Sequence, residues 1–76
     1  MDRLLDVRGL ACPLPALKAR AALTTLPPGD ALVVLATDPE APVDLGALAA
    51  ETERPFRAAR DPGGPWRLRI GEHPSP

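Results

Sequence analysis

Cys12 is the strongest candidate for a reactive side chain, because it is the one cysteine among 76 residues. It is followed by Pro13, Leu14 and Pro15. Proline is favoured in the first turn of a helix, where its missing N–H would be unpaired anyway, so the spacing places Cys12 at or just before a helix N-terminus. The positive end of a helix stabilises a thiolate, the nucleophilic form of cysteine, and a persulfide anion would gain in the same way.

Cys12 has other possible roles, namely a buried core residue, a metal ligand or one half of a disulfide. A free cysteine is often a small buried hydrophobe, and the sequence alone leaves that interpretation open. One Cys and one His cannot build a closed zinc site, which takes four ligands, so we expect no metal and no cofactor. A single cysteine also provides neither an internal disulfide nor the resolving thiol of a dithiol oxidoreductase, and it fits a reducing cytoplasm.

Length and charge limit the function classes further. The length predicts one domain over residues 1–76, with 71–76 as a flexible tail that contains His73, to which we assign no role. Nine basic and ten acidic residues lack the basic excess typical of nucleic-acid modules, so we expect no direct nucleic-acid partner. No apolar stretch approaches the ~20 residues of a membrane span, so we expect no membrane partner.

Hydrophobic patterning predicts the elements that position Cys12. The predicted strands are Leu4–Val7, Ala31–Ala36, Phe56–Arg60 and Trp66–Ile70, and the predicted helices run from Pro13 or Pro15 to about Leu26 and from Val43 to about Thr52. Strands that alternate with helices pair in parallel, and the closing hairpin makes one strand antiparallel. The predicted fold is an α/β (α+β) two-layer sandwich of order β-α-β-α-β-β. It has one mixed four-stranded sheet and two helices on one of its faces.

Side-chain spacing predicts the buried faces of these elements. The predicted core positions are Ala16, Ala19, Leu23 and Leu26 in the first helix, Leu45, Leu48 and Ala49 in the second, and Trp66, Leu68 and Ile70 in the last strand. Leu14 and Leu17 lie off this stripe and close to Cys12. They form either a docking strip for a partner or the ordinary exposed apolar surface that most proteins have.

Asp38 follows the predicted strand Ala31–Ala36. The carboxyl ends of parallel strands meet at one edge of a sheet, where open α/β sheets place their sites. Asp38 could therefore lie near Cys12 and help to select a basic partner surface. Asp38-Pro39 is also a common turn-forming pair, and that interpretation alone accounts for both residues.

The stretch from Leu5 to Pro15, with its Cys-Pro-Leu-Pro end, resembles the signature of the TusA/SirA-like family of sulfur-carrier proteins. The similarity continues through Pro28-Gly29, Thr37-Asp38-Pro39, Asp44-Leu45 and the closing Trp66–Ile70 segment. The resemblance implies the two-layer sandwich and a persulfide on Cys12. It also implies a cysteine desulfurase or rhodanese-type donor and a downstream acceptor in tRNA thiolation, molybdenum-cofactor maturation or sulfur-compound oxidation.

Two hypotheses of different kinds follow. In the first, Cys12 accepts sulfane sulfur from a donor and passes it on, which is a transfer half-reaction rather than a closed catalytic cycle. Such a carrier must expose its thiol, so we expect a monomer. In the second, the same fold is a regulatory or partner-binding domain without sulfur transfer.

Overall fold

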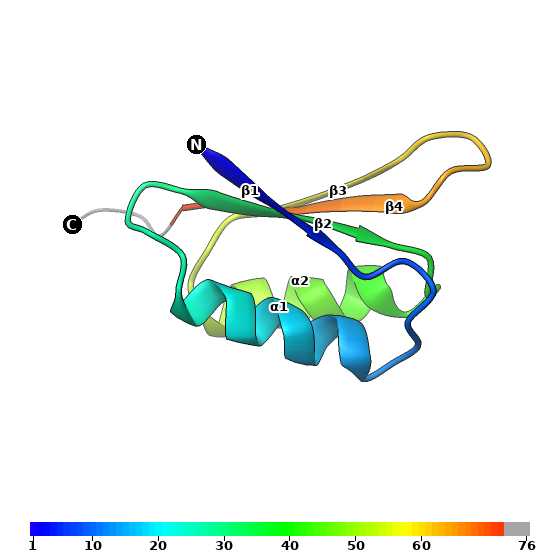
Figure 1. The fold of residues 1–76 in the computed structure, drawn as a ribbon, viewed down its shortest axis with the longest axis horizontal. Coiled ribbons are helices and arrows are strands. Elements are labelled where there is room, and N and C mark those ends of the chain that lie inside the picture. The colour runs from blue at the N-terminus through cyan, green and yellow to red at the C-terminus, as the bar shows by residue number, and fades with distance from the viewer. Residues whose placement is uncertain (73–76) are drawn as a thin grey trace.

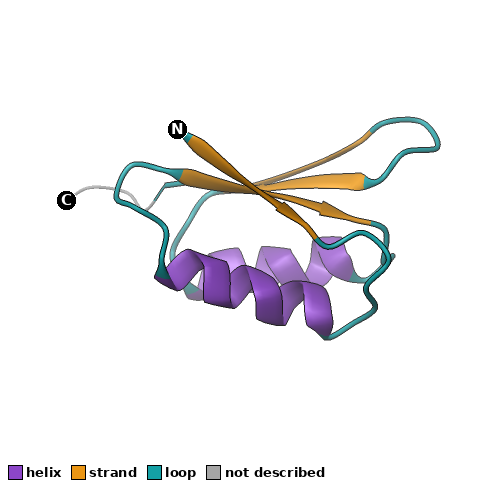
Figure 2. Cartoon of the chain, viewed as in Figure 1, coloured by secondary structure: helices purple, strands orange, loops and turns teal. Residues whose placement is uncertain are grey.

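The computed structural model describes residues 1–72, and residues 73–76 of the predicted tail, with His73, lie outside the described part. Its elements are β1 (Asp2–Asp6), α1 (Leu14–Thr24), β2 (Ala31–Ala36), α2 (Ala41–Glu51), β3 (Phe56–Arg60) and β4 (Trp66–Ile70). The sheet forms one layer, and both helices lie side by side on one of its faces (Figures 1 and 2). The predicted order and two-layer sandwich are confirmed. Within residues 1–72, no helix is long and apolar enough to cross a membrane.

The strand order of the sheet is β1-β2-β4-β3. β1 pairs with β2 in parallel, and β4 pairs antiparallel with both β2 and β3. β4 is thus the one antiparallel strand, as the closing hairpin predicts. Because β1 and β2 run in the same direction, they end at the same edge of the sheet, and α1 and α2 both begin there (Figure 1).

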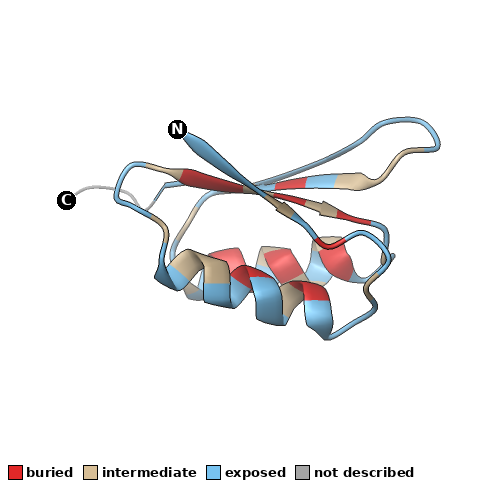
Figure 3. Ribbon diagram, viewed as in Figure 1, coloured by how far each residue is buried: buried red, intermediate tan, exposed pale blue. Residues whose placement is uncertain are grey.

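The core lies between the sheet and the helices, where buried segments of the two layers face each other (Figure 3). In β4, Leu68 and Ile70 are buried while Arg67 and Arg69 are exposed, as the alternation predicts, but Trp66 is only half-buried. The predicted face of α2 is also buried, namely Leu45, Leu48 and Ala49. β2 is central in the sheet, but its other face has no helix over it, so Val33 and Leu35 are only half-buried.

α1 departs from the prediction in its end and in its burial. It ends at Thr24 rather than Leu26. Ala19 is fully buried, whereas the other predicted stripe residues, Ala16, Leu23 and Leu26, are half-buried against the core. Pro15, which the stripe omitted, is buried. In so small a domain a helix is covered on one side only, so few of its positions are fully enclosed.

Other boundaries also differ from the prediction. β1 covers Asp2–Asp6 rather than Leu4–Val7. α2 begins at Ala41, two residues early, because Pro42 occupies its first turn, where proline is favoured. At the chain end, Gly71 is not part of a loose tail: it is buried, and its N–H donates to the carbonyl of Pro55 at 2.8 Å. The Gly71 carbonyl accepts a bond from Arg54 Nη1 at 3.1 Å.

Leu68→Ala tests whether the core depends on β4. Leu68 is 0% exposed, so we expect its truncation to lower the free energy of unfolding by about 2–5 kcal/mol. Leu4→Ala is the matched control, because Leu4 is 66% exposed and we expect almost no change. Urea unfolding measures both, and equal losses for the two variants would contradict this account of the core.

Candidate functional site at the edge shared by β1 and β2

The loop between β1 and α1 carries Cys12 along the edge where β1 and β2 end. Three backbone N–H groups of this loop attach it to β2 and the residues that follow. Val7 N–H donates to the Leu35 carbonyl at 2.9 Å, Gly9 N–H donates to Thr37 Oγ1 at 2.9 Å, and Cys12 N–H donates to Asp38 Oδ2 at 2.7 Å. Gly9 has a φ of +83°, which L side chains adopt only with strain, so glycine suits this turn.

Cys12 lies just before the first helix, as its spacing predicts. α1 begins at Leu14, with Pro13 at the N-cap position and Pro15 in the first turn. The Cys12 side chain is exposed, which removes the interpretation of Cys12 as a buried hydrophobe.

Asp44, in the first turn of α2, lies next to the thiol. Cys12 Sγ donates to Asp44 Oδ2 at 3.2 Å. This hydrogen bond is the largest cause that raises the pKa of the Cys12 thiol above its ordinary value. Partial desolvation and the charges of Asp44, Asp38 and Glu40 raise the pKa further.

The expectation that the helix start stabilises a thiolate is therefore wrong for the isolated chain. A helix N-terminus presents about half a unit of positive charge, whereas each ionised carboxylate presents a full negative charge. The carboxylate in contact with Sγ and the charges of Asp38 and Glu40 all raise the thiol pKa. We call Asp38, Glu40 and Asp44 together the acidic edge.

The geometry of Asp38 fits both its expected position near Cys12 and a turn-forming role. Asp38 Oδ2 accepts the Cys12 N–H, so this residue lies beside the candidate nucleophile. Asp38 Oδ1 also accepts the N–H of Glu40 at 3.3 Å, which is the local bond of a turn-forming aspartate. Asp38 thus joins the Cys12 loop to the loop that leads into α2.

Exposed apolar residues occur in the first turns of both helices. Leu14 is 44% exposed and Leu17 is 54% exposed. Val43, in the first turn of α2, is also exposed. Neither Val43 nor the contact of Asp44 with Cys12 was predicted from the sequence. Pro42 is the sequence feature that could have indicated them, because it marks a helix start at the same edge as Cys12.

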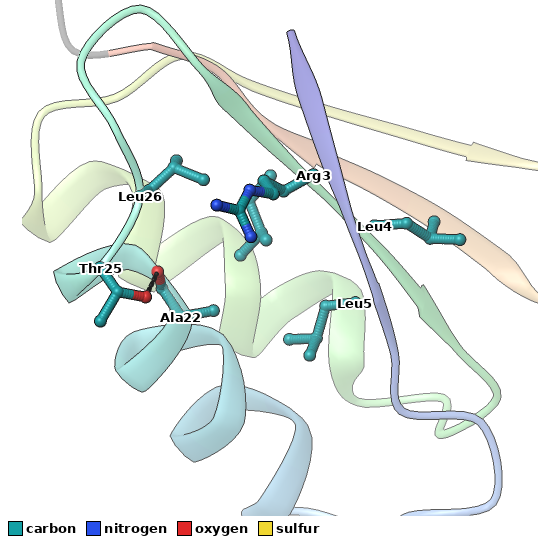
Figure 4. Close-up of a pocket in the computed structure, with 7 residues that line it drawn as sticks. Arg3, Leu4, Leu5, Ala22, Thr25 and Leu26 are labelled. Carbon is teal, nitrogen blue, oxygen red and sulfur yellow. Dashed lines mark hydrogen bonds between the residues drawn. The ribbon is translucent and has the colours of Figure 1, made fainter.

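Two other kinds of site receive no support. Among residues 1–72, no group of three or more His, Cys, Asp or Glu side chains is placed to hold a metal ion. A hollow of about 190 Å³ lies between β1 and the end of α1 (Figure 4). It is lined by Arg3, Leu4, Leu5, Ala22, Thr25, Leu26 and Leu32. Its one hydroxyl, on Thr25, donates to the Ala22 carbonyl, so the hollow offers no activated nucleophile.

The family described as Sulfurtransferase TusA matches residues 3–71. The chain belongs to the TusA family. A Neisseria meningitidis serogroup A protein named as a sulfur carrier is 45% identical over 64 residues, which cover 84% of this chain and 86% of that relative. Sulfur carrier protein TusA of Allochromatium vinosum is 38% identical over 69 residues, which cover 91% of each chain.

A solved structure agrees with the fold of this TusA-family chain. The SirA-like protein from Desulfitobacterium hafniense superposes with a TM-score of 0.84, covering 97% of this chain and 100% of that one. The two sequences are 21% identical, so this likeness concerns the fold alone. With the family match, it confirms the resemblance to TusA/SirA-like proteins.

Asp38→Ala tests how the Cys12 loop is held. We expect the Cys12 amide to exchange with solvent faster, about tenfold for each 1.4 kcal/mol of lost hydrogen-bond free energy. Hydrogen exchange followed by NMR measures this rate. Asp61→Ala in the β3–β4 turn is the control and leaves the Cys12 amide unchanged, and an unchanged rate in Asp38→Ala as well would contradict the role of Asp38.

Proposed function

We propose that this protein carries sulfane sulfur as a persulfide on Cys12, between a donor protein and an acceptor protein. The single observation that carries the proposal is the exposed thiol of Cys12. Its loop is held by hydrogen bonds to β2 and to the residues that follow β2, including the bond from Cys12 N–H to Asp38. In loading, Cys12 Sγ attacks the outer sulfur of the donor persulfide. An S–S bond forms at Sγ, the donor S–S bond breaks with its electron pair on the donor thiolate, and the Sγ proton is released.

Unloading reverses this step with a different partner. An acceptor thiolate attacks the outer sulfur, and the electron pair of the broken S–S bond returns to Cys12 Sγ, which takes up a proton. The sulfane sulfur moves without a change of oxidation state, so no external oxidant is needed. One thiol therefore suffices for each half-reaction, and a resolving cysteine is not required.

Partners of this carrier would dock over α1 and the acidic edge. We propose a cysteine desulfurase or rhodanese-type donor that covers Leu14 and Leu17 and places a basic side chain near Asp38. Support comes from the exposure of both leucines and from the bond of Asp38 to the Cys12 loop. We propose that the protein is a single-domain monomer in the cytoplasm. Its acceptor would serve tRNA thiolation, molybdenum-cofactor maturation or sulfur-compound oxidation.

Sulfur loading on Cys12 is tested with a cysteine desulfurase and cysteine that carries radiolabelled sulfur. We expect one labelled sulfur atom on the wild-type chain and none on Cys12→Ser. The label on the wild-type chain should be lost after treatment with a thiol reductant. Labelling of Cys12→Ser at the wild-type level would overturn the proposal. No label on either chain, with partner binding that survives Cys12→Ala, would favour the regulatory domain instead.

The docking strip is tested by placing a charge on it. Leu17→Asp should lower the rate of sulfur loading at least several-fold, because an apolar contact area would have to bury an unpaired carboxylate. Leu4→Asp is the matched control, since Leu4 is similarly exposed but lies on β1 rather than α1. Stopped-flow loading kinetics compare the two, and equal rates would place the docking surface elsewhere.

A further inference from the structure

The surroundings of Cys12 are opposite in charge to those of most activated cysteines. A reactive thiol commonly lies near Lys, Arg or protonated His, which stabilise its thiolate. Here Asp44 Oδ2 lies 3.2 Å from Sγ, and Asp38 Oδ2 lies 2.7 Å from the Cys12 backbone nitrogen. None of the ion pairs within residues 1–72 involves Asp38, Glu40 or Asp44.

Two basic side chains near Cys12 in the sequence pair with other carboxylates, and Lys18 of α1 is in none of the ion pairs of residues 1–72. Arg8, four residues before Cys12, donates to both carboxylate oxygens of Asp6, at 2.9 and 2.7 Å. Arg20 of α1 pairs with Glu51 of α2. Within residues 1–72, no Lys or Arg side chain pairs with the acidic edge, so its carboxylates are open to a cation of a partner.

Building on the proposed function, we propose that Asp44 keeps the proton on Cys12 until a partner docks. The partner then places a Lys or Arg side chain on Asp44 and so releases the thiol for attack. Asp44 is a positioning residue in this proposal, because it acts through Cys12 and never touches the transferred sulfur.

Electrostatics explain why a partner cation would work this way. A cation paired with Asp44 takes the hydrogen-bond acceptor away from Sγ and cancels the charge that opposes a thiolate. Docking also excludes water, which strengthens this pairing, since charges interact more strongly in a low dielectric. The Sγ proton passes to water before the interface closes over the site, and Sγ then attacks the outer sulfur of the donor as described above.

The same arrangement protects the carrier between partners. The thiolate, rather than the thiol, is the form that oxidants and stray electrophiles attack. A hydrogen bond to Asp44 and a negative local field keep the free chain in its thiol form. A partner without a cation at this place would leave the thiol unreactive, which gives the site selectivity as well as protection.

Alkylation of Cys12 by iodoacetamide, measured as a function of pH without any persulfide, tests the proposal. We expect Asp44→Asn to move the midpoint of the rate profile to lower pH. A fall of one unit in the thiol pKa gives about tenfold more thiolate, partly offset by its lower nucleophilicity, so the rate at neutral pH rises about threefold. Asp44→Glu, which retains the carboxylate, should stay close to the wild-type profile, and Asp61→Asn should match it.

A second arm supplies the cation directly. A tetralysine peptide should raise the alkylation rate of the wild-type chain more than that of Asp44→Asn, which retains Asp38 and Glu40, and sodium chloride at matched ionic strength should do less. Equal midpoints for the wild type and Asp44→Asn, or an equal peptide effect on both, would overturn the role of Asp44. Because no persulfide is present, failure of sulfur loading on Cys12 would leave these outcomes unchanged.

Discussion

Parallel pairing of β1 with β2 is the constraint on which the site depends. It brings the carboxyl ends of both strands to one edge, although the residues that follow them are far apart in the sequence. The Cys12 loop can then bond to the Leu35 carbonyl, Thr37 and Asp38. An antiparallel pair would send one of these loops to the opposite edge, and Cys12 would lose its anchor.

Several strands could be predicted from the sequence because buried segments are rich in apolar residues, either in a continuous run or at alternate positions. The run Ala31–Ala36 and the alternation of Trp66–Ile70 gave strand boundaries that match the structure. Helix ends were less predictable, since a proline can occupy more than one position of a first turn. At Pro42 the observed start of α2 is Ala41 rather than Val43, and Asp44 lies in the first turn from either start.

The charge around Cys12 could not be predicted in the same way. Cys12 and Asp44 are separated by 32 positions, and their contact depends on how two loops and the first turn of α2 are oriented. Sequence spacing placed the thiol at a helix start and so indicated a stabilised thiolate. The structure reverses that sign, because full charges in contact act more strongly than the partial charge of a helix end.

The site is exposed, yet its framework is anchored in the core on both sides. Val7, five residues before Cys12, is completely buried, and Pro15, three residues after it, is buried as well. Between them, Cys12 is exposed and is not part of the buried core cluster, so the proposed persulfide would form without repacking the interior. A chain of this size has little core free energy to spare, since small domains bury a modest share of their surface. An exposed thiol between two buried residues is therefore anchored to the core, while chemistry at Sγ stays separate from the packing that stabilises the fold.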